Sequence, residues 1–263
     1  MDLKIKGRIA LVTAATKGLG RACAEELSLA GCRLAICSRT AADVERAAKE
    51  ISAQSGHPVT PFVADMSKEA DIGRLLAEVR AKVGDPEILV ANAGGPPPGN
   101  FASTQIEQFV PAFELSALSS IRLTYGVMPA MQQKRWGRIV YITSIAVKQP
   151  IPFILLSNTA RTALAGFMKT VAREVAPTGV TLNAVLPGTH DTDRVRQTAH
   201  TRAQQEGIPY EQALELQAKN NPMQRLGRPE ELAGMVAFLC SDRAGFITGT
   251  NIEIDGGAYQ GLM

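Results

Sequence analysis

Residues 8–31 read RIALVTAATKGLGRACAEELSLAG, in which a short apolar run is followed by a glycine-containing turn and then by a segment with helical spacing of apolar residues. Aliphatic and β-branched side chains dominate residues 8–13, as is typical of a buried strand. Ala22, Leu27 and Leu29 carry the helical pattern, and Gly31 is a residue type that commonly follows the end of a helix. The stretch therefore predicts a strand, a tight turn and a helix, in that order.

The same unit recurs along the chain. Further β-branched or aliphatic runs occupy residues 33–38, 59–64, 87–91, 138–143, 180–186 and 250–254. Segments with helical spacing separate most of these runs, for example Ile72, Leu75, Leu76 and Val79. This alternation predicts β-α-β units, and hence a doubly wound α/β fold whose parallel sheet of about seven strands has helices on both faces. A chain of 263 residues suits one such domain, over residues 1–263.

Composition and charge exclude several classes of protein. The 28 basic and 25 acidic residues are interspersed, so the net charge of +3 forms no block that would indicate a nucleic-acid-binding arm. Apolar runs stay well short of the ~20 residues that a membrane span needs, and the amino terminus lacks the pattern of a secretory signal. The cysteines, at positions 23, 32, 37 and 240, show no C-x-x-C spacing that would suggest a zinc site. We expect a cytoplasmic protein that binds neither nucleic acid nor membrane.

Residues 189–222 interrupt the alternation. This segment is polar and glutamine-rich, and it has helical pieces without a strand. It follows the sixth predicted strand, and ligands of open α/β sheets bind outside the carboxyl ends of the strands. We therefore expect a lid over a ligand pocket.

The turn after the first strand predicts a dinucleotide site. A glycine-bearing turn between strand and helix lets backbone N–H groups approach a pyrophosphate at the positive end of the helix dipole. The turn lacks a strict G-x-G-x-x-G, and a purely structural turn is the alternative. The candidate cofactor-binding residues here are Thr13, Lys17, Gly18, Leu19 and Gly20.

The residues after the second strand favour NADP(H) over NAD(H). An NAD site would place an acidic residue there, to bind the ribose 2′-hydroxyl. This chain has Cys37-Ser38-Arg39 instead, and Arg39 together with Lys17 can grip a 2′-phosphate because a guanidinium offers paired donors to phosphate oxygens. The alternative is an exposed arginine in front of a helix, which Thr40 and Asp43 would open as a capping box.

Motifs in order along nearly the whole chain resemble those of the short-chain dehydrogenase/reductase family. Residues 13–20 resemble its T-G-x-x-x-G-x-G, with Ala14 in place of the first glycine; a positive φ there would cost alanine about 1 kcal/mol. Residues 227–231, 247–249 and 255–257 resemble its closing helix and strand. The resemblance implies a Rossmann-type fold and further cofactor contacts: Asp65 and Met66 at the adenine, Asn92, Ala93 and Gly94 at the adenosine ribose, and Pro187, Gly188, Thr189 and Thr192 at the nicotinamide carboxamide.

Residues 144–174, SIAVKQPIPFILLSNTARTALAGFMKTVARE, resemble the active-site segment of that family but depart from it at two positions. The family has a serine and then Tyr-x-x-x-Lys. Ser144 matches the serine that polarises the substrate carbonyl, whereas Ser157 and Arg161 replace the tyrosine and lysine that handle the proton. Ser116 stands where the family usually has an asparagine. Ser144, Ser157 and Arg161 are the candidate catalytic residues.

The two replacements cannot reproduce the usual proton transfer. Serine reaches about 4 Å less far than tyrosine and is a much weaker acid. Arginine can hold ribose hydroxyls and supply charge, but it does not release its proton. The candidate routes are a water polarised by Ser157 and Arg161, or another donor among Lys148, His190, Asp191 and Tyr210.

The leading hypothesis is an NADP(H)-dependent oxidoreductase acting on a carbonyl or alcohol by an atypical proton route. The chain resembles the 3-oxoacyl-(acyl-carrier-protein) reductase branch, which implies a small-molecule or acyl-thioester substrate and a homo-oligomer, either tetramer or dimer. The alternatives are a nucleotide-binding pseudoenzyme or regulatory protein without turnover, and a non-redox enzyme such as a lyase. Basic residues in the predicted lid either meet phosphates of an acyl carrier or form a solvated helix face: Arg194, Arg196, His200 and Arg202.

Overall fold

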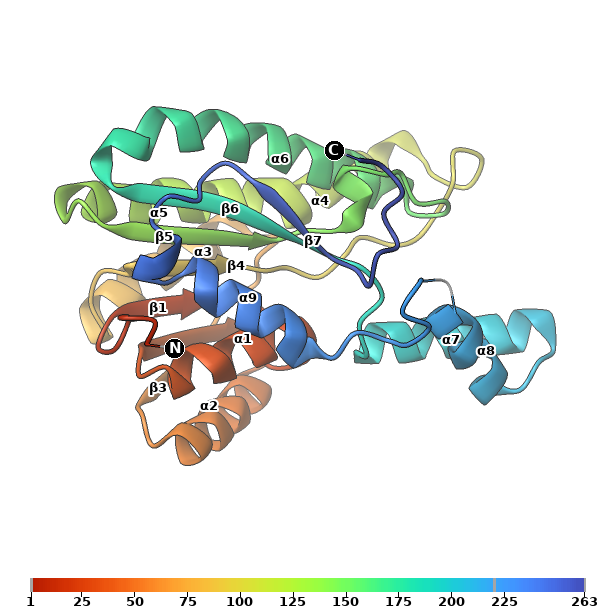
Figure 1. The fold of residues 1–263 in the computed structure, drawn as a ribbon, viewed down its shortest axis with the longest axis horizontal. Coiled ribbons are helices and arrows are strands. Elements are labelled where there is room, and N and C mark those ends of the chain that lie inside the picture. Colours follow the sequence, from red (N-terminus) through yellow and green to blue (C-terminus); the bar gives the residue numbers. More distant parts are fainter. Residues whose placement is uncertain (1, 220, 263) are drawn as a thin grey trace.

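The computed structural model describes residues 2–219 and 221–262, and within them it places seven parallel strands in one sheet (Figure 1). The strand order is β3-β2-β1-β4-β5-β6-β7. From β1 the chain adds β2 and β3 on one side of the sheet, and then adds β4 to β7 on the other side of β1. Each strand coincides with a predicted apolar run, and the expected Rossmann-type, doubly wound α/β fold is confirmed. The strands are β1 (Ile9–Val12), β2 (Arg33–Ser38), β3 (Val59–Val63), β4 (Ile88–Ala91), β5 (Gly137–Ile142), β6 (Val180–Pro187) and β7 (Asn251–Ile254).

Helices cover both faces of the sheet. One face packs against α1 (Gly18–Leu29), α2 (Ala41–Ser55) and α9 (Pro229–Leu239), and the other against α3 (Glu69–Lys82), α5 (Ser119–Gln133) and α6 (Leu155–Val175). Successive strand residues serve opposite faces, since Leu11 belongs to one core and Val12 to the other. Among the described residues, no helix has both the length and the hydropathy of a membrane span.

The helices α9 and α2 differ in how their first turns are capped. Pro229 opens α9, and the Glu231 carboxylate accepts the backbone N–H of Arg228 at 2.7 Å. The predicted capping box before α2 is wrong, because the side chain of Thr40 makes no capping hydrogen bond. The remaining short elements are 3₁₀ turns at Ile106–Gln108, Ile145–Val147, Ala176–Thr178 and Asp242–Ala244.

A π-helical turn joins the two helices that precede β5. It spans Glu114–Leu118, between α4 (Phe109–Phe113) and α5, so that the three form one continuous bent helix. π turns are rare and occur often at functional sites, because the extra residue displaces side chains from the regular helical positions. This turn, which holds Ser116, was not predicted from the sequence.

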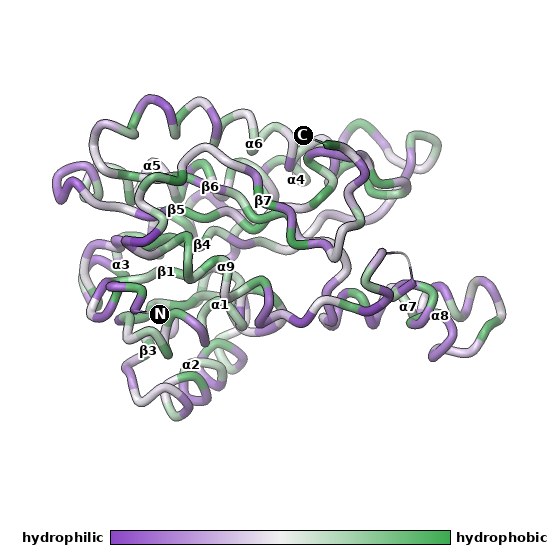
Figure 2. The backbone as a smooth tube through the Cα atoms, in the orientation of Figure 1, coloured by the Kyte–Doolittle hydropathy of each residue, from purple (hydrophilic) through white to green (hydrophobic). Residues whose placement is uncertain are grey.

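Within the predicted lid segment, α7 (Asp193–Glu206) and α8 (Tyr210–Lys219) form a hairpin, which extends away from the sheet in Figure 1. The expected helical insertion without a strand is confirmed. The hairpin is largely hydrophilic in Figure 2, and of its described side chains only those of Ala199 and Ala213 are buried. Its core is therefore very small.

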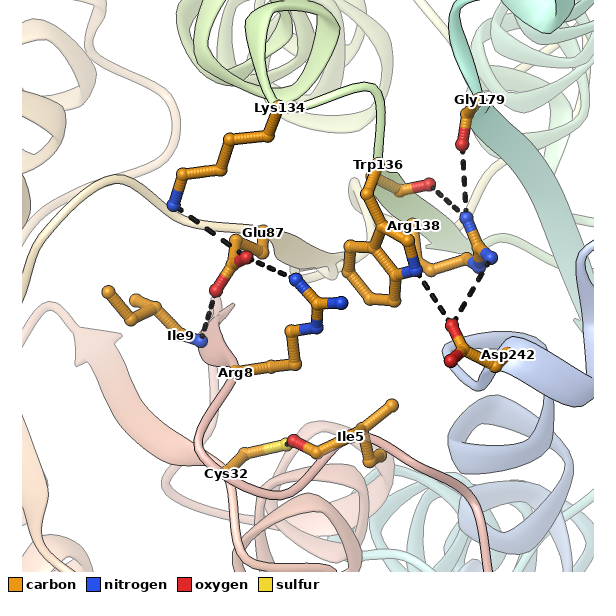
Figure 3. A network of polar contacts seen from close by, with 11 residues as sticks. Ile5, Arg8, Ile9, Cys32, Glu87, Lys134, Trp136, Arg138, Gly179 and Asp242 are labelled. Carbon is orange, nitrogen blue, oxygen red and sulfur yellow. Dashed lines mark hydrogen bonds and ion pairs between the residues drawn. The ribbon is translucent and has the colours of Figure 1, made fainter.

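A network of charged residues lies at the edge of the sheet where the strands begin, opposite to the edge formed by their carboxyl ends (Figure 3). Trp136 lies between two arginines, with the Arg8 guanidinium 3.9 Å and that of Arg138 4.5 Å from the ring centroid. Glu87 pairs with Arg8 at 2.6 Å, and Asp242 accepts the Trp136 indole N–H at 2.7 Å. Burial lowers the pKa of Arg138, and the charge of Asp242 offsets part of this shift. Each arginine of this network thus has both a carboxylate and an aromatic partner.

Candidate active site

The carboxyl ends of β1 and β4 are joined by Thr13 and Asn92. The Thr13 hydroxyl donates to the Asn92 carbonyl at 2.6 Å and accepts the Asn92 backbone N–H at 2.9 Å, and Thr13 is fully buried. The Asn92 side-chain amide donates in turn to the Ala14 carbonyl at 3.3 Å. These bonds hold the glycine turn against β4 at the point where ligands of such sheets bind. Direct contact of either residue with a cofactor stays a prediction.

The turn after β1 has the backbone geometry of a phosphate cradle. Ala14 has φ +48° and Gly18 has φ +58°, so the position where the family has glycine does adopt the left-handed conformation. A Cβ on Gly20 would lie 2.4 Å from the Ala14 carbonyl oxygen and 2.5 Å from Asn92 Nδ2, so only glycine fits there. This close approach packs the first turn of α1 against Ala14 and Asn92. The residues present therefore fit a dinucleotide pyrophosphate.

A pocket of about 320 Å³ opens in front of this turn. Its lining combines the glycine turn with the beginning of the α7–α8 hairpin, including Lys17, Gly18 and Thr192. The Thr192 methyl group lies 3.4 Å from where a Gly18 Cβ would be, and Lys17 lies 3.8 Å from Asp193. The structure thus brings Lys17 and Gly18 next to Thr192, a predicted cofactor residue from a distant part of the sequence.

The other predicted cofactor residues follow the carboxyl ends of neighbouring strands. Arg39 is exposed after β2. Burial of Asp65 favours a higher pKa, but hydrogen bonds from Ser67, and after them the charge of Arg39, lower the pKa of Asp65 overall. Gly188 is pressed against Asp255, whose Cα would lie 2.7 Å from an added Cβ. Leu19 lies in the first turn of α1, and the remaining residues lie along this edge: Met66 after β3, Ala93 and Gly94 after β4, and Pro187 and Thr189 at the end of β6.

Ser157 and Arg161 lie close to the end of β5, which Ser144 follows in the sequence. Arg161 donates from Nε to the Ser157 hydroxyl at 3.1 Å. Its Nη1 donates to the carbonyl oxygens of Ile142 and Thr143, at 3.1 and 2.8 Å. Arg161 therefore links α6 to the residues immediately before Ser144. The Ser144 hydroxyl accepts a backbone N–H at 3.1 Å and is half-buried, so it retains a proton to donate.

Arg161 stays charged in this setting. Burial, followed by the positive charge of Arg194, lowers the pKa of Arg161 to about 10, which still leaves the guanidinium protonated at neutral pH. Because Ser157 accepts a hydrogen bond from this group, its own hydroxyl proton points elsewhere. The pair can polarise a neighbouring molecule, but Arg161 cannot act as a proton donor.

Ser116 is buried in the π-helical turn, and its hydroxyl has no hydrogen-bond partner among the described residues. A buried hydroxyl without a partner is uncommon and usually indicates an ordered water or a ligand contact. The prediction that Ser116 occupies the place of the relay asparagine is compatible with this position and is not tested by it.

The four alternative proton donors have other partners. His190 is buried with Nδ1 3.3 Å from the Gly188 carbonyl oxygen, and burial lowers its pKa. Its ring packs on Gly227, where a Cβ would lie 2.8 Å away. The remaining three are engaged as follows: Lys148 pairs with Glu253, Asp191 pairs with Arg196, and Tyr210 stacks on His200. Their geometry supports structural roles.

One basic residue of the predicted lid lies at this edge, beside the residues predicted for the active site. Arg194, in the first turn of α7, has its guanidinium carbon 3.2 Å from where a Gly95 Cβ would lie, and its Nη2 is 3.5 Å from the Pro96 carbonyl oxygen. The base of the hairpin therefore reaches the loop after β4. A signal was present in the sequence, because a basic residue two positions after Thr192 opposes the helix dipole.

Comparison with known proteins agrees with this geometry. A family model described as "Enoyl-(Acyl carrier protein) reductase" matches residues 13–259. The chain therefore belongs to the short-chain dehydrogenase/reductase family, and the relatives named below are oxidoreductases.

Individual relatives extend over the whole chain. The 3-oxoacyl-[acyl-carrier-protein] reductase of Escherichia coli (strain K12) is 36% identical over 258 residues, which cover 98% of this chain and 100% of that protein. Dehydrogenase/reductase SDR family member 4 of Bos taurus is 33% identical, over 98% of this chain and 89% of its own length. The structure of L-sorbose reductase from Gluconobacter frateurii complexed with NADPH and L-sorbose is similar with a TM-score of 0.95, at 29% identity and over 100% of both chains.

Proposed function

We propose that this protein is an NADP(H)-dependent oxidoreductase that acts on a carbonyl or alcohol substrate by an atypical proton route. The glycine turn carries the proposal, because Gly20 leaves no room for a Cβ between Ala14 and Asn92, and Lys17 and Gly18 line the pocket in front of the start of α1. The NADPH complex of L-sorbose reductase supports the same class of cofactor. Small ketones and 3-oxoacyl thioesters are the candidate substrates.

Preference for NADP(H) rests on Arg39 and Lys17. Both side chains are exposed, one at the end of β2 and one in the glycine turn, so they can converge on a 2′-phosphate from two sides. NADPH should bind more tightly than NADH, and Arg39→Ala should narrow the difference. Titration of both nucleotides by their own fluorescence measures this preference.

The chain's own residues can serve the reaction as follows. When bound, the cofactor supplies or accepts a hydride. Ser144 donates a hydrogen bond to the substrate oxygen and polarises the carbonyl. The space that serine leaves relative to tyrosine admits a water, which the Ser157 hydroxyl orients while Arg161 supplies positive charge. This water, rather than a side chain, then delivers the proton to the developing alkoxide and takes up a replacement proton from bulk solvent.

The hairpin and the assembly state are part of the proposal. The α7–α8 hairpin acts as a lid, since its base contributes Thr192 and Arg194 to the same edge as the glycine turn. The rest of the chain forms a single domain, and we propose a cytoplasmic homo-oligomer, either tetramer or dimer. Light scattering of the purified protein tests the assembly.

A pseudoenzyme is the second candidate function, and the replacement of the tyrosine and lysine by Ser157 and Arg161 favours it. The decisive experiment titrates NADPH and then assays ketones, oxo acids and 3-oxoacyl thioesters with the loaded protein. Binding followed by turnover supports the oxidoreductase. Binding without turnover of any substrate favours the pseudoenzyme, and absence of nucleotide binding overturns both.

A further inference from the structure

Two arginines lie at the carboxyl ends of the neighbouring strands β4 and β5, and among the described residues neither is bonded to a carboxylate. Arg161 is held by the carbonyl oxygens of Ile142 and Thr143, and Arg194 by that of Pro96. The positive charge of Arg194 is felt at Arg161, where it helps to lower the pKa. Within the part of the chain that the structure describes, neither guanidinium forms an ion pair.

This arrangement is unfavourable for the protein alone. Two like charges repel, and burial of Arg161 removes part of the water that would screen them. Arg194 also lies in the first turn of α7, where the helix dipole disfavours a cation. Elsewhere in the same helix, arginines are paired: Arg196 with Asp191 at 2.9 Å, and Arg202 with Glu206 at 2.8 Å. Arg194 thus differs from these two arginines of its own helix in having no carboxylate partner among the described residues.

The position of the pair points to the substrate. Arg161 binds the backbone immediately before Ser144, the residue proposed to hold the substrate oxygen. Arg194 contacts the loop after β4, which is the neighbour of β5 in the sheet. The pyrophosphate cradle, by contrast, lies around Gly18 at the beginning of α1. An anion between the two guanidiniums would thus lie beside the reacting carbonyl.

We propose that Arg161 and Arg194 bind an anionic oxygen group, a carboxylate or phosphate, carried by the substrate itself. Guanidinium forks match the planar oxygens of such groups, and a bound anion removes the repulsion between the two cations. This inference rests on the proposed oxidoreductase function and narrows it. The substrates it selects are oxo acids or phosphorylated ketones, in preference to neutral ketones and neutral acyl thioesters.

Matched probe pairs test the proposal on the NADPH-loaded protein. The acids are 2-oxopentanoate, 4-oxopentanoate and 5-oxohexanoate, each compared with its methyl ester, and dihydroxyacetone phosphate is compared with dihydroxyacetone. An N-acetylcysteamine thioester of 3-oxobutanoate serves as the neutral thioester. Calorimetry gives affinity, and NADPH oxidation gives kcat and KM. At least one anion should bind about 10-fold to 100-fold more tightly than its neutral partner.

Variants assign the effect to Arg194. Arg194→Ala should remove the preference for the anion and leave binding of the neutral partner and of NADPH within about 2-fold. Arg194→Lys should retain part of it, since the charge remains and the fork is lost. Arg202→Ala is the matched control, because it removes an arginine of the same helix that already pairs with Glu206, and it should change nothing.

Each contrary result has a distinct meaning. If NADPH does not bind, the proposed function fails together with this inference. If NADPH binds and neutral probes bind or react as well as the anions, or if no anion binds, the inference is overturned and the oxidoreductase stands. If Arg194→Ala weakens NADPH and leaves every anionic probe unaffected, the arginine serves a cofactor phosphate, which also overturns it.

Discussion

Arginines at the two edges of the sheet, where the strands begin and where they end, have opposite electrostatic surroundings. At the edge where the strands begin, Arg8 and Arg138 enclose Trp136 and are paired with Glu87 and Asp242 (Figure 3). At the edge where they end, Arg161 is bound only to neutral oxygens.

The difference distinguishes arginines that stabilise the fold from an arginine that is available to bind a ligand. A charge that is fully compensated within the fold contributes to holding the elements together and has little left to offer a ligand. A charge that the fold leaves uncompensated makes the empty protein less stable and favours binding of an opposite charge. We expect changes at the first edge to alter unfolding, and changes at the second to alter binding and turnover.

The largest effect should follow Gly20→Ala, at the ligand edge. The added Cβ would lie 2.4 Å from the Ala14 carbonyl oxygen, so the turn must shift away from its cradle geometry. NADPH affinity should fall at least about 100-fold, as measured by NADPH fluorescence. Gly73→Ala in α3 is the control, since its Cβ would meet nothing within 4 Å. Unchanged NADPH binding by a folded Gly20→Ala protein would contradict the assignment of the cradle.

Trp136→Ala tests the opposite edge. The ring lies between two guanidiniums and donates a hydrogen bond to Asp242, so its loss should lower the free energy of unfolding by about 2 to 3 kcal/mol. Trp136→Phe keeps the ring and loses the hydrogen bond, and should cost about 1 kcal/mol. Urea unfolding followed by circular dichroism measures both. A change in NADPH affinity of either folded variant would contradict the expectation that this edge of the sheet affects stability and not ligand binding.

The double replacement Ser157→Tyr with Arg161→Lys sharpens the comparison at the ligand edge. It restores the phenol and amine of the family, so reduction of an uncharged ketone should speed up about 10-fold or more. Oxo acids should gain less, because the Arg161 fork is lost. Stopped-flow measurement of NADPH oxidation gives the rate of the chemical step. If neither substrate gains, the proton donor is not limiting, and Ser116 is the next residue to replace.

The smallest effect concerns Glu231, near the base of the hairpin. Hydrogen bonds from Arg225, and then from the Arg228 backbone, lower the pKa of Glu231 from 4.5 to about 2. A carboxylate with a depressed pKa stabilises the fold above pH 4.5, and this contribution is lost as the pH falls toward 2. Glu231→Gln should therefore unfold with a weaker pH dependence across that window than the unaltered protein. Identical acid profiles would show that this exposed pair contributes nothing measurable.

The fold could be predicted from the sequence because strand and helix periods alternate along the whole chain. Every predicted strand run is a strand, and Ala14 has the positive φ that its place in the turn suggested. Local rules were less reliable: Thr40 does not cap α2, since side-chain capping depends on rotamers that sequence does not specify.

The site was predictable where it depends on backbone and not where it depends on contacts between distant segments. Gly20 and Thr192 could be placed from motif spacing. The bonds from Arg161 to β5 could not, because they depend on how α6 packs over the strand. The approach of Arg194 to Pro96 joins residues 98 positions apart, and the π turn around Ser116 has no local signature.

The small interior of the α7–α8 hairpin should make this part of the protein prone to local unfolding. With only two alanines to expose among its described buried side chains, the hairpin should open at a fraction of the free energy that global unfolding needs. A protease should cut there first and leave the seven-stranded body intact. Substrate bound beneath it should slow that cut, which makes the rate of nicking a gauge of occupancy.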